Sequence, residues 1–161
     1  SVHEYPTSEE MSEIAISAAR VVRLFGFDPK VAFVSHSTFG QPVTSRTKHI
    51  RKAVDILREK NVDFQFDGDM QPDVALNKEY KNLYPFSNIV GNANILIMPG
   101  QHSAAISYKM MKELGDTKVI GPLLIGLGLP IEIAPLRSST SELINLASIA
   151  AYSADVIDYS K

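Results

Sequence analysis

The chain contains no cysteine, which excludes disulfide bridges, thiolate metal ligands and a cysteine nucleophile. Long apolar runs are also missing. None reaches the roughly 18 residues that a membrane-spanning helix needs, and the N-terminal segment carries acidic residues where a signal peptide carries lysines and an apolar core. We therefore expect a cytoplasmic protein with no membrane partner.

Positive charge is not in excess either. The formal net charge is −2 and the isoelectric point is near 6.1, so the sequence lacks a basic surface for a phosphate backbone and we expect no nucleic-acid partner. Apolar residues make up 45% of the chain and charged residues 21%, as in ordinary globular proteins. The 161 residues suffice for one domain or part of a larger one. Because Ser1 lies so close to a predicted helix start, we expect a piece of a longer polypeptide.

Caps and apolar residues at helical spacing predict four helices. They cover residues 7–26, 50–57, 104–114 and 141–157. The first is marked most clearly, because Thr7 and Glu10 have the spacing of a capping box and Gly26 follows the apolar stripe as a C-cap. Gly115 is expected to end the third.

Short runs rich in β-branched and aromatic residues predict buried strands. They cover residues 30–35, 64–69 and 94–99. Two further apolar runs, 119–126 and 130–135, are punctuated by Gly and Pro, and 78–92 is expected to be a long surface loop. Because strand and helix alternate, we predict an α/β fold with three α/β/α layers and a mostly parallel sheet covered by helices on both faces.

Ligands of open parallel sheets collect at the carboxyl ends of the strands, so the loops there hold the candidate site residues. The first loop carries the hydroxyls of Ser35, Ser37 and Thr38, which suit an anion near the next helix N-terminus. The spacing of a P-loop is missing, and a plain polar loop is the favoured interpretation.

A second loop contains three carboxylates, Asp67, Asp69 and Asp73. They suit a cation, acid–base chemistry, or capping of the next helix, and capping is favoured because the longer ligand series of a calcium loop is absent. In a third loop, His102 beside Ser103 suits polarisation of a carbonyl, although a surface position is more common for such a histidine. The histidines lack metal-ligand spacing, so no metal site is predicted.

Arg137 precedes the last predicted helix together with several hydroxyls, in the segment LRSSTSE at 136–142. A forked guanidinium with hydroxyls beside it suits a phosphate or a carboxylate. A helix N-cap together with a solvated arginine explains the segment equally well. From these residues alone, an enzyme acting on a phosphate-bearing ligand and a binding module remain open.

The order of four segments resembles the second half of phosphate acetyltransferases. They are KVAFVSHSTFG at 30–40, FQFDGDMQPDVALN at 64–77, NILIMPGQHSAAISYK at 94–109 and VIGPLLIGLGLPIEIAPLRSS at 119–139. Within the second segment the family pattern D-G-E-[LM]-Q-x-D recurs from Asp67 to Asp73, with Asp69 in place of the glutamate. The resemblance covers nearly the whole chain.

This resemblance implies about half of a two-lobed phosphotransacetylase domain, similar in fold to isocitrate and isopropylmalate dehydrogenases. Residues 1–134 would form the second lobe, and 135–161 a C-terminal helix that returns to the other lobe. In active members of the family, a serine precedes the arginine that matches Arg137, and an aspartate six residues later is the proposed base. Leu136 and Leu143 stand at those positions. The resemblance therefore implies no catalytic residues here, because a leucine cannot take a proton.

The departures, including His102 and Ser103 in place of family residues, resemble the homologous domain behind the catalytic region of bacterial NADP-dependent malic enzymes. That implies a regulatory and oligomerising role, a homodimer or higher homo-oligomer, and an effector such as acetyl-CoA or an acyl phosphate held near Ser35, Ser37 and Arg137. NADP and a divalent metal would belong to the N-terminal malic enzyme region, with no cofactor in this chain. The alternatives are an active phosphate acetyl- or butyryltransferase and a purely structural oligomerisation module.

Overall fold

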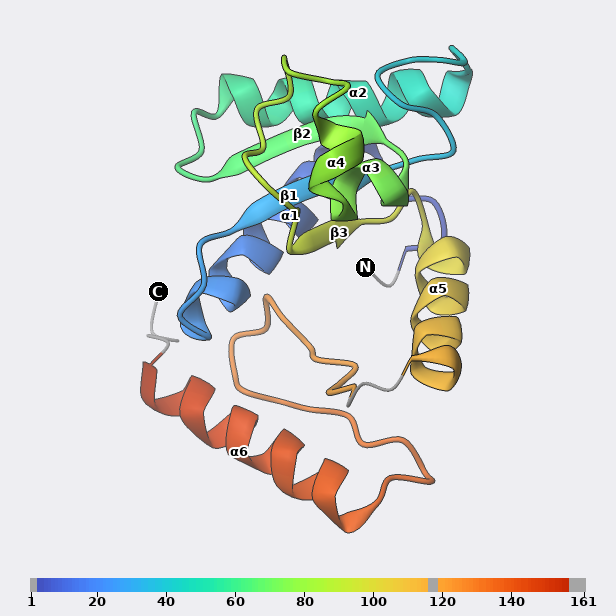
Figure 1. The fold of residues 1–161 in the computed structure, drawn as a ribbon. Helices are drawn as coiled ribbons and strands as arrows, with labels where there is room; N and C mark the ends of the chain where they lie inside the picture. Colours follow the sequence, from blue (N-terminus) through green and yellow to red (C-terminus); the bar gives the residue numbers. More distant parts are fainter. Residues whose placement is uncertain (1–2, 116–118, 157–161) are drawn as a thin grey trace. The chain divides into compact units, whose positions relative to one another are not determined.

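The computed structural model describes residues 3–115 and 119–156. It divides into two compact units, which we call unit 1 (Ser1–Lys109) and unit 2 (Met110–Lys161), and each unit is described by itself. Figure 1 shows the elements in chain order, coloured along the sequence. Their bounds are α1 Ser8–Leu24, β1 Lys30–Val34, α2 Ser45–Glu59, β2 Gln65–Met70, α3 Pro72–Leu76, α4 Lys78–Lys81, β3 Ile95–Ile97, α5 Gln101–Leu114 and α6 Thr140–Val156.

The sheet of unit 1 has three parallel strands in the order β2-β1-β3. Central strand β1 pairs Phe33 with Gly68 and then Val34 with Met70, so Asp69 is an extra residue that bulges from β2. Gly68 allows the two strands to approach closely, because a Cβ there would lie 2.7 Å from the Phe33 Cβ. All the strand pairs are parallel, as the alternation of strand and helix predicts.

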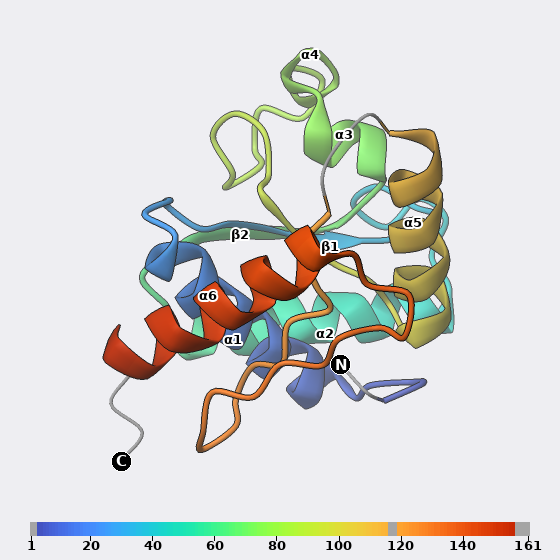
Figure 2. The same ribbon diagram turned by 90° about the horizontal axis from the view of Figure 1, so that it is seen from below.

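Helices cover both faces of this sheet, which confirms the three-layer prediction. On one face, Val31 and Phe33 of β1 pack with buried apolar residues of α1 and α2. Successive strand residues point to opposite faces of a sheet. Ala32 of β1 therefore points to the other face, where it belongs to a second buried cluster with Val74 and Ala75 of α3. Figure 2 shows α1 and α2 on one side of the sheet and α3 with α4 on the other.

Local signals placed most helix ends correctly. At the start of α1, Thr7 and Glu10 form the predicted capping box, and Gly26 follows the helix with φ +80°. Helix α5 begins at Gln101, three residues before the predicted start, and ends at Leu114 as predicted. Helix α6 begins at Thr140, and the last residue of its predicted span, Ile157, lies outside the described residues.

The segment 78–92, predicted as an irregular surface loop, opens with the short helix α4 and is otherwise irregular and mostly exposed, as predicted. It is fixed to unit 1 by Ile89, which is buried, and by Asn88, whose N–H donates to Asp67. The apolar runs 119–126 and 130–135 form no strand in the described structure. Their prolines and glycines explain this, since proline donates no ladder hydrogen bond.

Candidate functional site

The hydroxyls that follow β1 point into unit 1. Ser37 is fully buried and its hydroxyl donates to Asp69 Oδ2. The Ser35 Oγ lies 3.3 Å from the Ser37 Oγ, and the Thr38 hydroxyl accepts the Gln71 N–H at 3.2 Å. The structure therefore brings the three predicted hydroxyls together, with each of them bonded to the protein.

Asp69 is the centre of this network. Its carboxylate is fully buried and accepts the Arg51 Nε–H at 3.0 Å as well as the Ser37 hydroxyl. A buried carboxylate is costly unless it is paired and hydrogen-bonded, and here both conditions are met. Arg51 lies on α2, and no sequence pattern predicts that it pairs with Asp69, because an arginine on the polar side of a helix is ordinarily solvated. Only the structure shows that it meets a residue of the bulge in β2.

The predicted capping role is wrong for Asp67 and Asp69, whereas Asp73 lies in the first turn of α3 and accepts the Val74 N–H at 2.9 Å. Helix α3 has Gln71 as its N-cap with no side-chain hydrogen bond, and Pro72 follows at the first position. Proline has no N–H there that would need a cap. Asp67 and Asp69 lie earlier, within β2, where Asp67 Oδ1 accepts the Gly68 N–H at 3.0 Å and Oδ2 the Asn88 N–H at 2.7 Å. The carboxylates thus hold loops to the sheet.

His102 and Ser103 lie in the first turn of α5 rather than in a loop. His102 Nε2 lies 2.9 Å from Glu4 Oε1, and 73% of the histidine side chain is exposed. The Ser103 hydroxyl donates to the Gly100 carbonyl at 2.8 Å. These two residues therefore have bonding partners different from those of the hydroxyls after β1.

Arg137 belongs to unit 2, where its side chain is exposed ahead of α6. The helix cap is formed by its neighbours: the Ser139 hydroxyl accepts the Glu142 N–H at 3.3 Å, and the Glu142 carboxylate accepts the Ser139 N–H at 2.7 Å. The Ser139 N–H is the main cause that lowers the pKa of Glu142 below its ordinary value, and the Ser139 hydroxyl and Lys112 add to it. The capping interpretation of this segment is thus seen directly, and Arg137 is left outside the cap.

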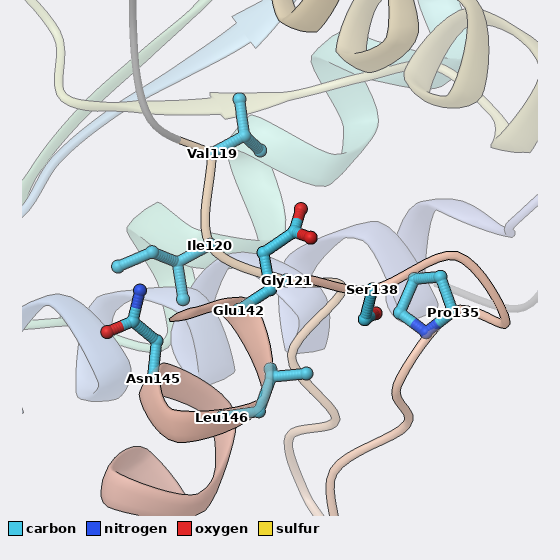
Figure 3. A pocket seen from close by; sticks show the side chains of 8 residues that line it. All are labelled: Val119, Ile120, Gly121, Pro135, Ser138, Glu142, Asn145 and Leu146. Atoms are coloured by element: carbon cyan, nitrogen blue, oxygen red, sulfur yellow. The ribbon is translucent and has the colours of Figure 1, made fainter. Parts of the chain in front are cut away.

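A small hollow lies behind the cap, between Ser138, Glu142 and Leu146 (Figure 3). Its volume is about 10 Å³, the size of a single water molecule. The buried Ser138 Oγ makes no hydrogen bond to the described part of the chain, so one water suits it. This hollow is too small for an effector.

The predicted site residues therefore divide between the two units. Ser35, Ser37 and Thr38 are gathered in unit 1, whereas Arg137 lies in unit 2. Leu136 and Leu143 are both exposed. Across residues 3–115 and 119–156, no group of three histidine or acidic side chains gathers as a metal site requires. No helix in the same ranges is long and apolar enough to cross a membrane.

Comparison with known proteins gives matches that span both units. The family model described as "Phosphate acetyl/butaryl transferase" matches residues 1–151. The NADP-dependent malic enzyme of Rhizobium meliloti is 50% identical over 153 residues, which are 95% of this chain and 20% of that protein. The phosphate acetyltransferase of Clostridium acetobutylicum is 34% identical over 155 residues, which are 95% of this chain and 46% of that protein.

Among solved structures, the phosphotransacetylase from Streptococcus pyogenes is similar with a TM-score of 0.90 and 34% identity. The match covers 96% of this chain and 47% of that chain. This chain thus spans about a fifth of the length of the Rhizobium meliloti malic enzyme and just under half of the Clostridium acetobutylicum and Streptococcus pyogenes proteins.

Proposed function

The chain belongs to the phosphate acetyl/butyryl transferase family, and from that premise we propose that it is a regulatory and oligomerising domain that binds acetyl-CoA or an acyl phosphate without turning it over. The protein that contains it would be a cytoplasmic NADP-dependent malic enzyme. Its N-terminal region would bind NADP and a divalent metal and convert malate to pyruvate. The 50% identity with the Rhizobium meliloti enzyme supports this assignment.

The observation that carries the proposal is the pair of leucines around Arg137. Leu136 and Leu143 stand where the resemblance expects a serine and a proton-accepting aspartate. Leu136 is fully exposed and Leu143 is 47% exposed, and a hydrocarbon side chain neither donates nor accepts a proton. Acyl transfer to the thiol of coenzyme A needs a base, so we expect no turnover.

Arg137 keeps the chemistry that an effector requires. Its side chain is exposed, and the hydroxyl and carboxylate beside it are used by the α6 cap. An arginine in this state offers a forked donor for a phosphate or a carboxylate group. We propose that Arg137 contacts the anionic part of the effector.

The oligomeric role is supported by α5, which has no buried residue. Its exposed apolar side chains are Ile106, Met110, Met111 and Leu114. Exposed apolar surface of this kind marks protein interfaces. We propose that the domain contributes to a homodimer or a higher homo-oligomer.

Calorimetric titration of acetyl-CoA into the full-length protein tests the effector proposal. Arg137→Ala is expected to weaken binding about tenfold or more, the effect of losing one charge-assisted contact. Arg20→Ala, which removes an exposed arginine from α1, is the matched control and is expected to bind like the wild type. The same samples are assayed for acetyl phosphate formation from acetyl-CoA and phosphate.

The second candidate function is an active phosphate acetyl- or butyryltransferase. It is favoured by the 34% identity with the Clostridium acetobutylicum enzyme over 95% of this chain. Turnover in the acetyl phosphate assay would replace the regulatory proposal with this one. If the protein shows neither acetyl-CoA binding nor turnover, a purely structural oligomerisation module is the remaining function.

A further inference from the structure

Unit 1 contains a hollow of about 480 Å³ beside β2. It is formed by Phe39, by α2 and by the loop that follows α4. This volume lies in the range of small-molecule sites. Of the candidate site residues predicted from the sequence, the lining of this hollow includes Asp67 but none of the predicted hydroxyls and not Arg137. The lining also includes Arg51, Arg58, Phe39 and Phe86.

Arg51 is held in place at this hollow by two contacts. Its Nε–H donates to the fully buried Asp69 at 3.0 Å. Its guanidinium lies against Gly40, where a Cβ would come within 1.9 Å of Nη2. The side chain is still 40% exposed. Among the described residues Arg51 bonds only through Nε, so both Nη groups are available as donors in a fixed orientation.

Two aromatic rings form the apolar part of the hollow. The ring centroids of Phe39 and Phe86 lie 4.8 Å apart with an interplanar angle of 66°. Phe39 has a φ of +47°, unusual for a bulky residue, and its N–H is bound to the Asp69 carbonyl at 2.6 Å. Phe86 remains 63% exposed although its ring contacts Phe39. An apolar ligand group would cover it.

The acidic groups near the hollow are already paired. Both oxygens of Asp67 accept backbone N–H groups. Arg58 donates through Nη1 to Asp55 at 2.7 Å, and its Nη2 lies 3.6 Å from Asp67. The Nη groups of Arg58 are thus paired with Asp55 and Asp67, whereas the Nη groups of Arg51 make no hydrogen bond to the described residues. This difference makes Arg51 the anion-binding group of the hollow.

We propose that the hollow binds a small amphiphilic anion, with its carboxylate or phosphate group on the Nη groups of Arg51 and its apolar group against Phe39 and Phe86. A guanidinium that is already held in position loses little conformational entropy when it binds an anion. Burial of an apolar group against two aromatic rings is also favourable. This site is independent of the effector site proposed around Arg137 and stands or falls separately.

Calorimetry on the full-length protein with three probes tests the site: phenyl phosphate, inorganic phosphate and benzyl alcohol. Phenyl phosphate is expected to bind tightest because it alone has both groups. Arg51→Gln should weaken phenyl phosphate at least about tenfold. Phe86→Ala should weaken phenyl phosphate about threefold and leave inorganic phosphate unchanged, because only the ring contact is lost.

Arg20→Gln, which changes an exposed arginine of α1, is the matched control for Arg51→Gln. If Arg51→Gln fails to fold, Phe86→Ala still tests the site, because the Phe86 side chain is mostly exposed and its removal should not disturb folding. Thermal melts confirm that each variant is folded. The proposal is overturned if phenyl phosphate does not bind, if Arg20→Gln weakens it as much as Arg51→Gln, or if a folded Phe86→Ala variant binds it like the wild type. The acetyl-CoA titration with Arg137→Ala does not affect any of these outcomes.

Discussion

The two units of the chain differ in how much of their apolar surface they bury. In unit 1 the sheet and helices enclose two clusters of buried side chains, and Phe33, Met11 and Leu57 are fully inaccessible. In the described part of unit 2, Leu146 is the one buried apolar side chain. Leu129, Leu136 and Ile144 are instead exposed by 65%, 106% and 60%.

This difference separates two roles within one chain. Unit 1 positions its polar groups by its own packing, so the Ser37–Asp69–Arg51 network has a fixed geometry. Unit 2 presents apolar side chains that would be buried only against another surface. Truncation of a buried apolar side chain in unit 1 should therefore lower the free energy of unfolding, whereas truncation of an exposed apolar side chain in unit 2 should change it little.

The strongest test of the contrast is Phe33→Ala in the core of unit 1. The side chain is fully buried at the centre of the sheet, so its removal leaves a cavity and should lower the free energy of unfolding by about 3–5 kcal/mol. Urea denaturation followed by circular dichroism measures the loss. A loss below about 1 kcal/mol would show that the core of unit 1 is not closely packed.

Asp69→Asn should have the next largest effect. The amide keeps the shape of the carboxylate but loses the charge that pairs with Arg51, at a cost of about 1–3 kcal/mol in the free energy of unfolding. Glu13→Gln is the matched control, because Glu13 forms an exposed ion pair with Lys60 that should contribute under 1 kcal/mol. Equal losses in the two variants would contradict the special position of Asp69.

Ser139→Ala should have a local effect in unit 2. The variant removes the hydroxyl cap of α6, which should cost about 1 kcal/mol of helix stability. Hydrogen exchange of the first amides of α6 is the direct measurement, and faster exchange confined to that turn is expected. Faster exchange throughout unit 1 would instead mean that the two units unfold together.

The same cap predicts a pH dependence. Since the folded pKa of Glu142 is depressed, its stabilising contribution is present above the unfolded value, about 4.3, and is lost as the pH falls through the folded pKa. Protection of the first amides of α6 should therefore decrease in acid. Ser139→Ala should show a smaller decrease, and an equal decrease in both proteins would contradict the assignment.

Leu136→Ala is expected to have the smallest effect on the free energy of unfolding. A side chain that is fully exposed contributes little to folding, so the free energy of unfolding should change by less than about 0.5 kcal/mol. A larger loss in urea denaturation of the full-length protein would show that Leu136 is covered there by another part of the protein.

Much of the fold could be predicted from the sequence because its signals are local. The Thr7 capping box, the apolar stripes of α1 and α2 and the three strands each lie within one short segment. The sequence does not predict the early start of α5, because Gln101 and His102 resemble the polar loop before them. The two-lobed arrangement similar to isocitrate dehydrogenase, and the division at residues 134 and 135, stay predictions.

The site was predicted less well because its bonds join distant segments. The sequence predicts Ser37 in a candidate anion-binding loop and Asp69 in a capping segment, and only the fold shows that the Ser37 hydroxyl donates to the Asp69 carboxylate. No sequence pattern marks Arg51, since its pairing with Asp69 depends on a bulge in β2. The leucines beside Arg137 were identified by resemblance, which depends on order along the chain rather than on contacts.

The central place of β1 also has a consequence for folding order. Each strand pair of the described sheet includes β1, and Val31 pairs with Phe66 on one side and Ile95 on the other. The second partner lies almost twice as far along the chain, so closing that loop costs more entropy and should come later. We expect α1, β1, α2 and β2 to assemble first, with β3 joining afterwards, and the β1 amides to be among the slowest in the protein to exchange with solvent.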